Sequence, residues 1–79
     1  MDIQTIESKV FAIAKEVFSY DGEVTRESTS KDIKAWDSMN QMRLIAEVEK
    51  AFSIKFKMKD LLKFASLGNI IDGVQEKLG

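Results

Sequence analysis

Three stretches of this chain place apolar residues at the spacing of an amphipathic helix, and this periodicity limits the fold more than any other feature. The stretches are residues 3–18, 38–52 and 67–78. Their apolar stripes consist of Ile6, Val10, Ile13, Ala14, Val17 and Phe18, then of Leu44, Ile45, Val48, Ala51 and Phe52, and finally of Leu67, Ile70, Ile71, Val74 and Leu78. Each stripe needs the others to be buried, so the sequence predicts helices packed around one core.

The segment before the last helix predicts one short helix and no sheet. Residues 54–58 alternate apolar and basic side chains, which is typical of a strand, but a lone strand has no partner in a helical chain. We therefore expect an extended connection that buries Ile54 and Phe56, followed by a short helix at about residues 59–63. The predicted fold is all-α: a small four-helix bundle with three main helices and one short helix.

Polar residues and glycines predict where these helices begin and end. Asp2 or Thr5 suits the N-cap of the first helix and Ser66 that of the last, because their oxygens accept hydrogen bonds from free N–H groups of the first turn. Gly22 predicts the end of the first helix, since glycine readily adopts the left-handed conformation of many C-caps. Gly73, inside the last helix, predicts a place of close packing.

The connection between the first two main helices, residues 19–36, is long for so small a chain. It is mostly polar but contains three large apolar residues, Val24, Ile33 and Trp36. We expect these side chains to hold the loop against the bundle. Trp36 directly precedes the pair Asp37-Ser38, so its packing would fix how that serine is presented.

The composition excludes several classes of function. The sequence has no cysteine and no histidine, so it lacks disulfides, thiolate nucleophiles, the usual general base at neutral pH and the commonest metal ligand. We therefore predict neither an enzyme nor a metal site. The sequence shows no signal peptide and no apolar run long enough to cross a bilayer, which predicts a cytoplasmic protein. Its 79 residues, with a net charge of −1, predict a single domain over residues 1–79 and a monomer.

The second helical stretch carries more than a core stripe. It opens with Asp37-Ser38, a pair that favours a helix N-terminus. On the far side, Met39, Met42 and Ala46 form a second, narrower apolar stripe that the core does not obviously need. A serine hydroxyl is therefore expected at the start of a helix, beside a small apolar patch.

This serine has several interpretations. A serine nucleophile needs a base and a site for the oxyanion, and the lack of histidine argues against that role. Ser38 could instead be modified by another enzyme, since the free N–H groups and the dipole of a helix N-terminus stabilise an attached phosphate. The simplest interpretation is a helix cap without further function, which is the commoner role of an Asp-Ser pair.

The segment Trp36-Asp37-Ser38-Met39, with the helix that continues to Ile54, resembles acyl carrier proteins around their phosphopantetheine attachment site, which is usually Asp-Ser-Leu. The resemblance extends over nearly the whole chain, from the first helix and long loop to the last helix. It implies that a separate phosphopantetheinyl transferase esterifies Ser38 with 4′-phosphopantetheine from coenzyme A. The thiol of this arm would carry an acyl group as a thioester, which agrees with the lack of cysteine.

The resemblance also assigns roles to other residues and partners. Asp37 would help the transferase to recognise the site. The docking surface for partner enzymes would consist of Met39, Met42, Arg43 and Ala46, although Met42 fits a role in the periphery of the core equally well. An acyl pocket between the second and third helices would be lined by Ile45, Phe56, Leu61 and Phe64, although core packing alone also explains these residues. The expected partners are an acyl-loading ligase or acyltransferase and a ketosynthase or other acyl-processing enzyme.

The charges depart from the family pattern. Carriers of fatty acid biosynthesis are usually strongly acidic along the second helix, which meets basic patches on their enzymes. Here that helix carries Arg43 and Lys50 alongside Glu47 and Glu49, and residues 55–63 are rich in lysine. Because electrostatic complementarity sets partner choice and encounter rate, the sequence predicts a carrier for a dedicated pathway, such as a specialised lipid, a polyketide or an acylated sugar.

Three alternatives remain open from the sequence. The motif Asp-Ser-Met also occurs in D-alanine carriers, but the downstream Phe-Asp-Arg feature is missing here, and residues 34–37 do not fit the Gly-Gly-His/Asp-Ser start of peptidyl carriers. An unmodified helical adaptor would use the Met39 and Met42 patch to bind a partner helix. A nucleic-acid binder is disfavoured because no helix concentrates positive charge.

Overall fold

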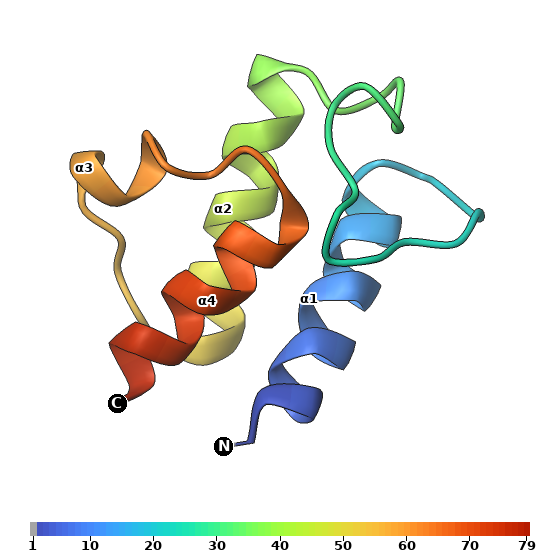
Figure 1. Ribbon diagram of the computed structural model, residues 1–79. Coiled ribbons are helices and arrows are strands. Elements are labelled where there is room, and N and C mark those ends of the chain that lie inside the picture. The colour runs from blue at the N-terminus through green and yellow to red at the C-terminus, as the bar shows by residue number, and fades with distance from the viewer. Residues whose placement is uncertain (1) are drawn as a thin grey trace.

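The computed structural model describes residues 2–79 and contains four helices in that range. They are α1 (Ile3–Val17), α2 (Ser38–Phe52), α3 (Met58–Leu61) and α4 (Leu67–Leu78). Helix α1 packs against both α2 and α4, and the short α3 lies outside the other three, beside α2 (Figure 1). The predicted all-α fold of three main helices and one short helix is confirmed.

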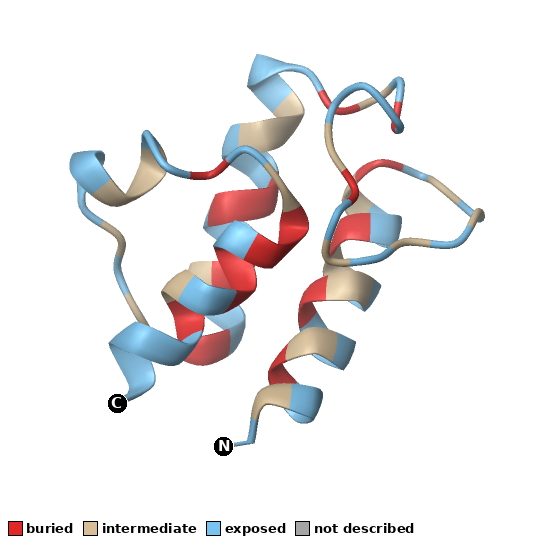
Figure 2. Ribbon diagram, viewed as in Figure 1, coloured by how far each residue is buried: buried red, intermediate tan, exposed pale blue. Residues whose placement is uncertain are grey.

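The core lies where the three predicted stripes face one another (Figure 2). The nine largest side chains that are almost completely buried are Ile6, Val10, Ile33, Leu44, Val48, Leu67, Ile70, Ile71 and Val74. Two predicted stripe residues are exposed instead. Ala51 is exposed at the edge of its stripe, and Leu78 is 41% exposed because the last turn of α4 is open on all sides.

The predicted caps of α1 and α4 are confirmed, but the predicted end of α1 is wrong. Asp2 accepts a hydrogen bond from the Thr5 N–H at 2.8 Å, and Ser66 caps α4. Helix α1 ends at Val17 with Phe18 as its C-cap, and the residue that adopts the left-handed conformation after the cap is Ser19 (φ 49°), not Gly22. The Tyr20 N–H then bonds back to a carbonyl of the last helical turn, which closes a Schellman-type end.

All three predicted anchors of the long loop pack against the bundle. Ile33 and Trp36 are buried, and Val24 is half-buried and packed against the core. The Trp36 ring stacks on Phe18 at the end of α1, with ring centroids 5.2 Å apart. Burial of such aromatic surface supplies much of the stability of a small core, so the loop is part of the folded structure and not a loose connection.

The same loop caps the N-terminus of α4. The first turn of a helix has N–H groups without partners inside the helix. The loop supplies two carbonyls to them: Ser28 accepts from the Leu67 N–H at 3.1 Å, and Arg26 accepts from the Gly68 N–H at 2.8 Å. An isolated bridge between Thr29 and Ser66 extends this contact. The loop and α4 therefore hold each other in place.

Arg26 adds an ionic connection between loop and helices. Its guanidinium contacts Glu7 of α1 at 2.9 Å and Asp72 of α4 at 2.6 Å. Because its side chain is more than one-third exposed, solvent screens both pairs and their stabilising effect is modest. The two pairs connect the loop to both α1 and α4.

Helix α3 is shorter and begins earlier than predicted, because Asp60 defines its first turn. The Asp60 carboxylate accepts a hydrogen bond from the Lys57 N–H at 2.8 Å and pairs with Lys77 of α4 at 3.2 Å. The Lys57 N–H, with a smaller effect of Lys77, holds the pKa of Asp60 below its ordinary value. Gly73 provides the predicted close contact, since the Phe64 ring packs directly over it.

We predict that Gly68→Ala destabilises the fold even though alanine favours helix. A Cβ at position 68 would lie 2.9 Å from the backbone carbonyl oxygen of Arg26, which cannot move without breaking the cap of α4. The free energy of unfolding, measured by urea denaturation, should fall by about 1–3 kcal/mol. The control Gly73→Ala meets the movable Phe64 ring at 2.9 Å and should cost less. A Gly68→Ala variant as stable as wild type would contradict this account of the cap.

Candidate functional site

Asp37 and Ser38 form the start of α2, and their roles differ. Asp37 is the N-cap, with extended backbone (φ −109°, ψ −176°), and its carboxylate accepts from the Asn40 N–H at 2.8 Å. Its carbonyl accepts from the Gln41 N–H, also at 2.8 Å. Ser38 is the first helical residue and is exposed. The predicted Asp-Ser helix start is therefore confirmed, with the aspartate alone as the cap.

The Ser38 hydroxyl is free to react with an outside group. Among residues 2–79, the Ser38 hydroxyl takes part in no hydrogen bond. Within the same range, the adjacent cap Asp37 forms no salt bridge. The hydroxyl sits at the positive end of the α2 dipole, where N–H groups favour a bound phosphate. Within this described range no three potential ligands gather to hold a metal ion.

The Gln41 side chain, on the first turn of α2 after Ser38, forms hydrogen bonds with two other parts of the chain. Its side-chain oxygen accepts a hydrogen bond from the Trp36 indole N–H. Its amide nitrogen donates to the Phe64 carbonyl at 3.4 Å. One side chain on α2 thus connects the loop before the helix with the segment between α3 and α4. This arrangement satisfies the buried indole N–H, which would otherwise be costly to bury.

An open groove adjoins Ser38 and has Gln41 in its lining. Its volume is about 380 Å³, and it is lined by Ser30, Trp36, Asp37, Ser38, Gln41, Phe64 and Ala65. The lining is both polar and aromatic. Such a groove has room for a narrow chain that leaves the serine and runs over the Trp36 and Phe64 side chains.

Comparison with known proteins identifies the family. The family model for the phosphopantetheine attachment site matches residues 8–74 of this chain. The chain belongs to the acyl carrier protein family. An acyl carrier protein of Thermotoga maritima is 32% identical over 77 residues, which are 96% of this chain and 95% of that protein. An acyl carrier protein of an Exiguobacterium species is 28% identical over 67 residues, which are 85% of each chain.

Solved structures support the same membership. The solution structure of a holo acyl carrier protein from Geobacter metallireducens has a TM-score of 0.83 and 37% identity, covering 91% of this chain and 84% of that one. A putative acyl carrier protein from Mycobacterium tuberculosis has a TM-score of 0.82 and 22% identity, covering 90% and 96%. The latter likeness is one of fold alone. Within residues 2–79, no helix is long and apolar enough to cross a membrane.

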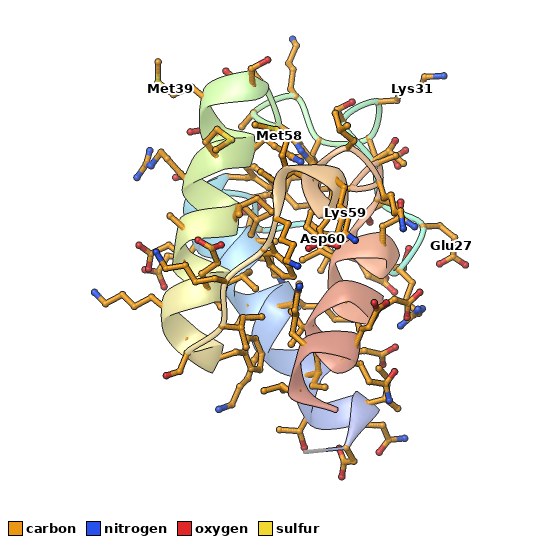
Figure 3. The ribbon with its side chains drawn as sticks, turned by 90° about the vertical axis from the view of Figure 1, so that its left-hand side faces the viewer. Glu27, Lys31, Met39, Met58, Lys59 and Asp60 are labelled. Atoms are coloured by element: carbon orange, nitrogen blue, oxygen red, sulfur yellow. The ribbon has the colours of Figure 1, made fainter. Side chains whose placement is uncertain are left out.

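The four predicted docking residues lie on the exposed side of α2. Met39 is 75% exposed and Met42 is 56% exposed, and Arg43 and Ala46 are also exposed. The alternative that Met42 fills the periphery of the core is therefore wrong. Figure 3 shows Met39 at the outer end of α2, at the edge of the face that also carries α3.

The four predicted pocket residues belong to the packed core or border it. Ile45 and Phe64 are buried, and Phe56 and Leu61 are half-buried against the core. The Phe56 and Phe64 rings meet edge to face, with centroids 4.9 Å apart. Phe64 lines the groove beside Ser38, whereas Ile45, Phe56 and Leu61 do not. Their role in binding an acyl chain stays a prediction.

Three residues of this region escaped sequence reasoning. Gln41 looked like an ordinary polar position, because both of its partners come from other parts of the fold. Met58 and Leu62 were assigned to a connection and a short helix, but they are 73% and 82% exposed. Large exposed apolar side chains are informative only once the fold is known, since sequence alone places them in the core.

We predict that Gln41→Ala destabilises the contact of α2 with the Trp36 side chain and the Phe64 carbonyl. It removes the acceptor of the Trp36 indole and the donor to Phe64, so the free energy of unfolding should fall by about 1–2 kcal/mol. Trp36 is the sole tryptophan, so its emission should shift to longer wavelength as water reaches the indole.

The control for this variant is Gln75→Ala, at an exposed position of α4. It should change neither the emission nor, beyond about 0.5 kcal/mol, the stability. Unchanged tryptophan emission in Gln41→Ala would show that the Trp36–Gln41 contact is not maintained in solution.

Proposed function

We propose that this chain carries acyl intermediates on a 4′-phosphopantetheine arm esterified to Ser38. The observation that carries the proposal is the exposed, unengaged Ser38 hydroxyl at the N-terminus of α2, beside an open groove. The family to which the chain belongs is defined by phosphopantetheine attachment. The arm would supply a thiol, which holds the acyl group as a thioester.

The residues around Ser38 suit this group. The phosphate would lie at the positive end of α2, where the helix dipole and free N–H groups stabilise negative charge. Asp37 keeps the first turn of α2 in shape through its bond to the Asn40 N–H, which supports its expected role in recognition by the transferase. The groove lined by Trp36 and Phe64 offers a path for the pantetheine part of the arm.

The chain itself contributes attachment and presentation, not catalysis. Acyl carrier proteins are not enzymes, and this sequence has neither the cysteine nor the histidine that acyl transfer commonly uses. The chemistry would be performed by separate enzymes: a phosphopantetheinyl transferase, an acyl-loading ligase or acyltransferase, and a ketosynthase or other acyl-processing enzyme. These enzymes would contact the exposed side of α2. The exposure of Met39, Met42, Arg43 and Ala46 supports a role of these residues in docking.

We further propose a cytoplasmic, monomeric single-domain carrier of a specialised acyl pathway. The mixed charges of α2 and the lysines that follow it support this assignment, because docking partners are selected by electrostatic complementarity. An acyl chain would shelter next to Ile45, Phe56, Leu61 and Phe64, where apolar side chains already gather. An aminoacyl cargo is the main alternative, and it would use the same arm.

We predict that only variants that retain Ser38 accept the arm. The protein is incubated with coenzyme A, magnesium and a permissive phosphopantetheinyl transferase, and its intact mass is measured. Wild type should gain one phosphopantetheine and Ser38→Ala none. Ser30→Ala is the matched control, because Ser30 lines the same groove, and it should be modified like wild type.

The outcome separates the carrier from an adaptor. A mass gain in Ser38→Ala would place the arm elsewhere. No gain in wild type with several transferases would remove the carrier function and favour a helical adaptor, for which Ser38→Ala would matter little because the α2 cap is Asp37.

We also predict poor turnover by housekeeping enzymes. Fatty acid synthase enzymes should acylate and elongate the holo protein more slowly than their own carrier. The reason is that its α2–α3 region carries lysines, whereas the basic patches of those enzymes bind acidic residues. A competition assay with both carriers in one reaction measures this. Equal use of the two carriers would contradict a dedicated pathway.

A further inference from the structure

The charges of this chain are unevenly distributed along the sequence. Residues 38–64, which include α2 and α3, contain six basic and three acidic side chains. The rest of the chain contains six basic and ten acidic side chains. The segment with α2 and α3 is therefore net positive in an overall weakly acidic protein, and such an asymmetry orients a protein in the field of a charged partner before contact.

Two of the three acidic residues in residues 38–64 face their own backbone. The Glu49 carboxylate accepts a hydrogen bond from the Phe56 N–H at 2.8 Å. Asp60 accepts from the Lys57 N–H at 2.8 Å and pairs with Lys77 at 3.2 Å. The negative charge of these carboxylates is directed inward and matched locally. Glu47 is the acidic residue that remains exposed in this segment.

The basic residues, in contrast, have no acidic partners. The ion pairs formed within residues 2–79 are those of Arg26 and Lys77. Arg43, Lys57, Lys59 and Lys63 are exposed and take part in none of them. Their positive charge is therefore available to a partner.

The elements that carry these cations, α2 and the segment around α3, also carry large exposed apolar side chains. Met39 and Met42 from α2, Met58 at the start of α3 and Leu62 just after α3 are all more than half exposed. Figure 3 shows Met58 and Lys59 on one face, with Met39 at its outer edge. We call these four residues the methionine face. Methionine adapts its shape to different partners, which makes such a patch suitable for docking.

We propose that the methionine face docks proteins whose contact surface has an apolar centre and an acidic rim. The acidic rim would meet Arg43, Lys57, Lys59 and Lys63, and the apolar centre would cover the methionines. This inference deepens the proposed carrier function by naming the chemistry of its enzymes, and it assigns them a polarity opposite to that expected for fatty acid synthase partners. It also adds Met58 and Leu62 to the docking surface.

A protein fits this face better than a lipid surface or a nucleic acid. Binding to anionic membranes relies on clusters of adjacent basic residues or a continuous amphipathic helix. Here the cations come from two elements, α3 has only four residues, and Glu47 lies among them. An apolar centre with a charged rim is the usual anatomy of a protein interface.

The test uses two designed helical peptides with the same leucine stripe, one flanked by glutamates and one by lysines. Binding to the ¹³C-methyl methionine-labelled protein is followed by NMR. The glutamate peptide should bind about tenfold more tightly in about 20 mM salt and lose most of this advantage in about 500 mM salt. The methyl signals of Met39, Met42 and Met58 should shift.

Matched charge reversals identify the surface. Lys59→Glu/Lys63→Glu should reverse the preference between the two peptides. Lys31→Glu/Lys34→Glu makes the same change in net charge on the loop before α2, where both lysines are exposed, and should leave the preference unchanged. Circular dichroism of all variants shows whether each is folded.

Several outcomes would overturn the proposal. These are equal binding of the two peptides, an equal effect of both lysine pairs, methionine signals that do not shift, or binding to phosphatidylserine vesicles in preference to the glutamate peptide. The same titration is made with Ser38→Ala, which should behave like wild type. A failure of arm attachment therefore leaves this result intact, and a failure of peptide binding leaves the attachment result intact.

Discussion

The structure depends on the way the loop after α1 closes over the end of α4. A chain of this length has little surface to bury, so it must use its connections as well as its helices. The loop contributes Ile33 and Trp36 to the core and gives the Arg26 and Ser28 carbonyls to the first N–H groups of α4. A segment with no regular structure thereby satisfies a helix end and completes the hydrophobic cluster. Without it, the Leu67 and Gly68 N–H groups of α4 would lose their acceptors, and Phe18 at the end of α1 would lose the ring stacked on it.

The packing of the loop also positions Ser38, through the contacts of Trp36 two residues earlier in the chain. Trp36 is fixed by stacking on Phe18 and by its hydrogen bond to Gln41. Asp37 and Ser38 follow immediately, so the start of α2 has little freedom to move. An exposed hydroxyl at a helix end beside a groove suits the attachment of a long flexible arm. In the proposed function, the arm would supply the mobility, and the protein would supply a fixed attachment point and a surface for recognition.

Local rules predicted the helices and the Asp-Ser start of α2 well. The apolar stripes needed only the helical period, and the caps Asp2, Asp37 and Ser66 needed only side-chain oxygens next to free N–H groups. The end of α1 was missed because Ser19 adopts a left-handed conformation that costs a non-glycine residue about 1–2 kcal/mol. Packing of the residues that follow must offset that cost, and a local pattern does not contain this information.

Long-range contacts explain the remaining differences. The hydrogen bonds of Gln41 join residues five and 23 positions away, so no spacing rule identifies them. The exposure of Met58 and Leu62 depends on the position of α3. The ion pair between Asp60 and Lys77, again a tertiary contact, connects α3 to α4. The family resemblance predicted Ser38 as the attachment site, but the shape of its surroundings required the fold.

The placement of the chain ends has a consequence for how the carrier could be assembled with other proteins. Both described ends of the chain lie at the same end of the bundle, and Ser38 lies at the start of α2 at the opposite end (Figure 1). A linker joined at either end would therefore act as a hinge at the base of the molecule. Ser38 would stay on the side away from such a linker, so a partner protein could approach the start of α2 without meeting the linker.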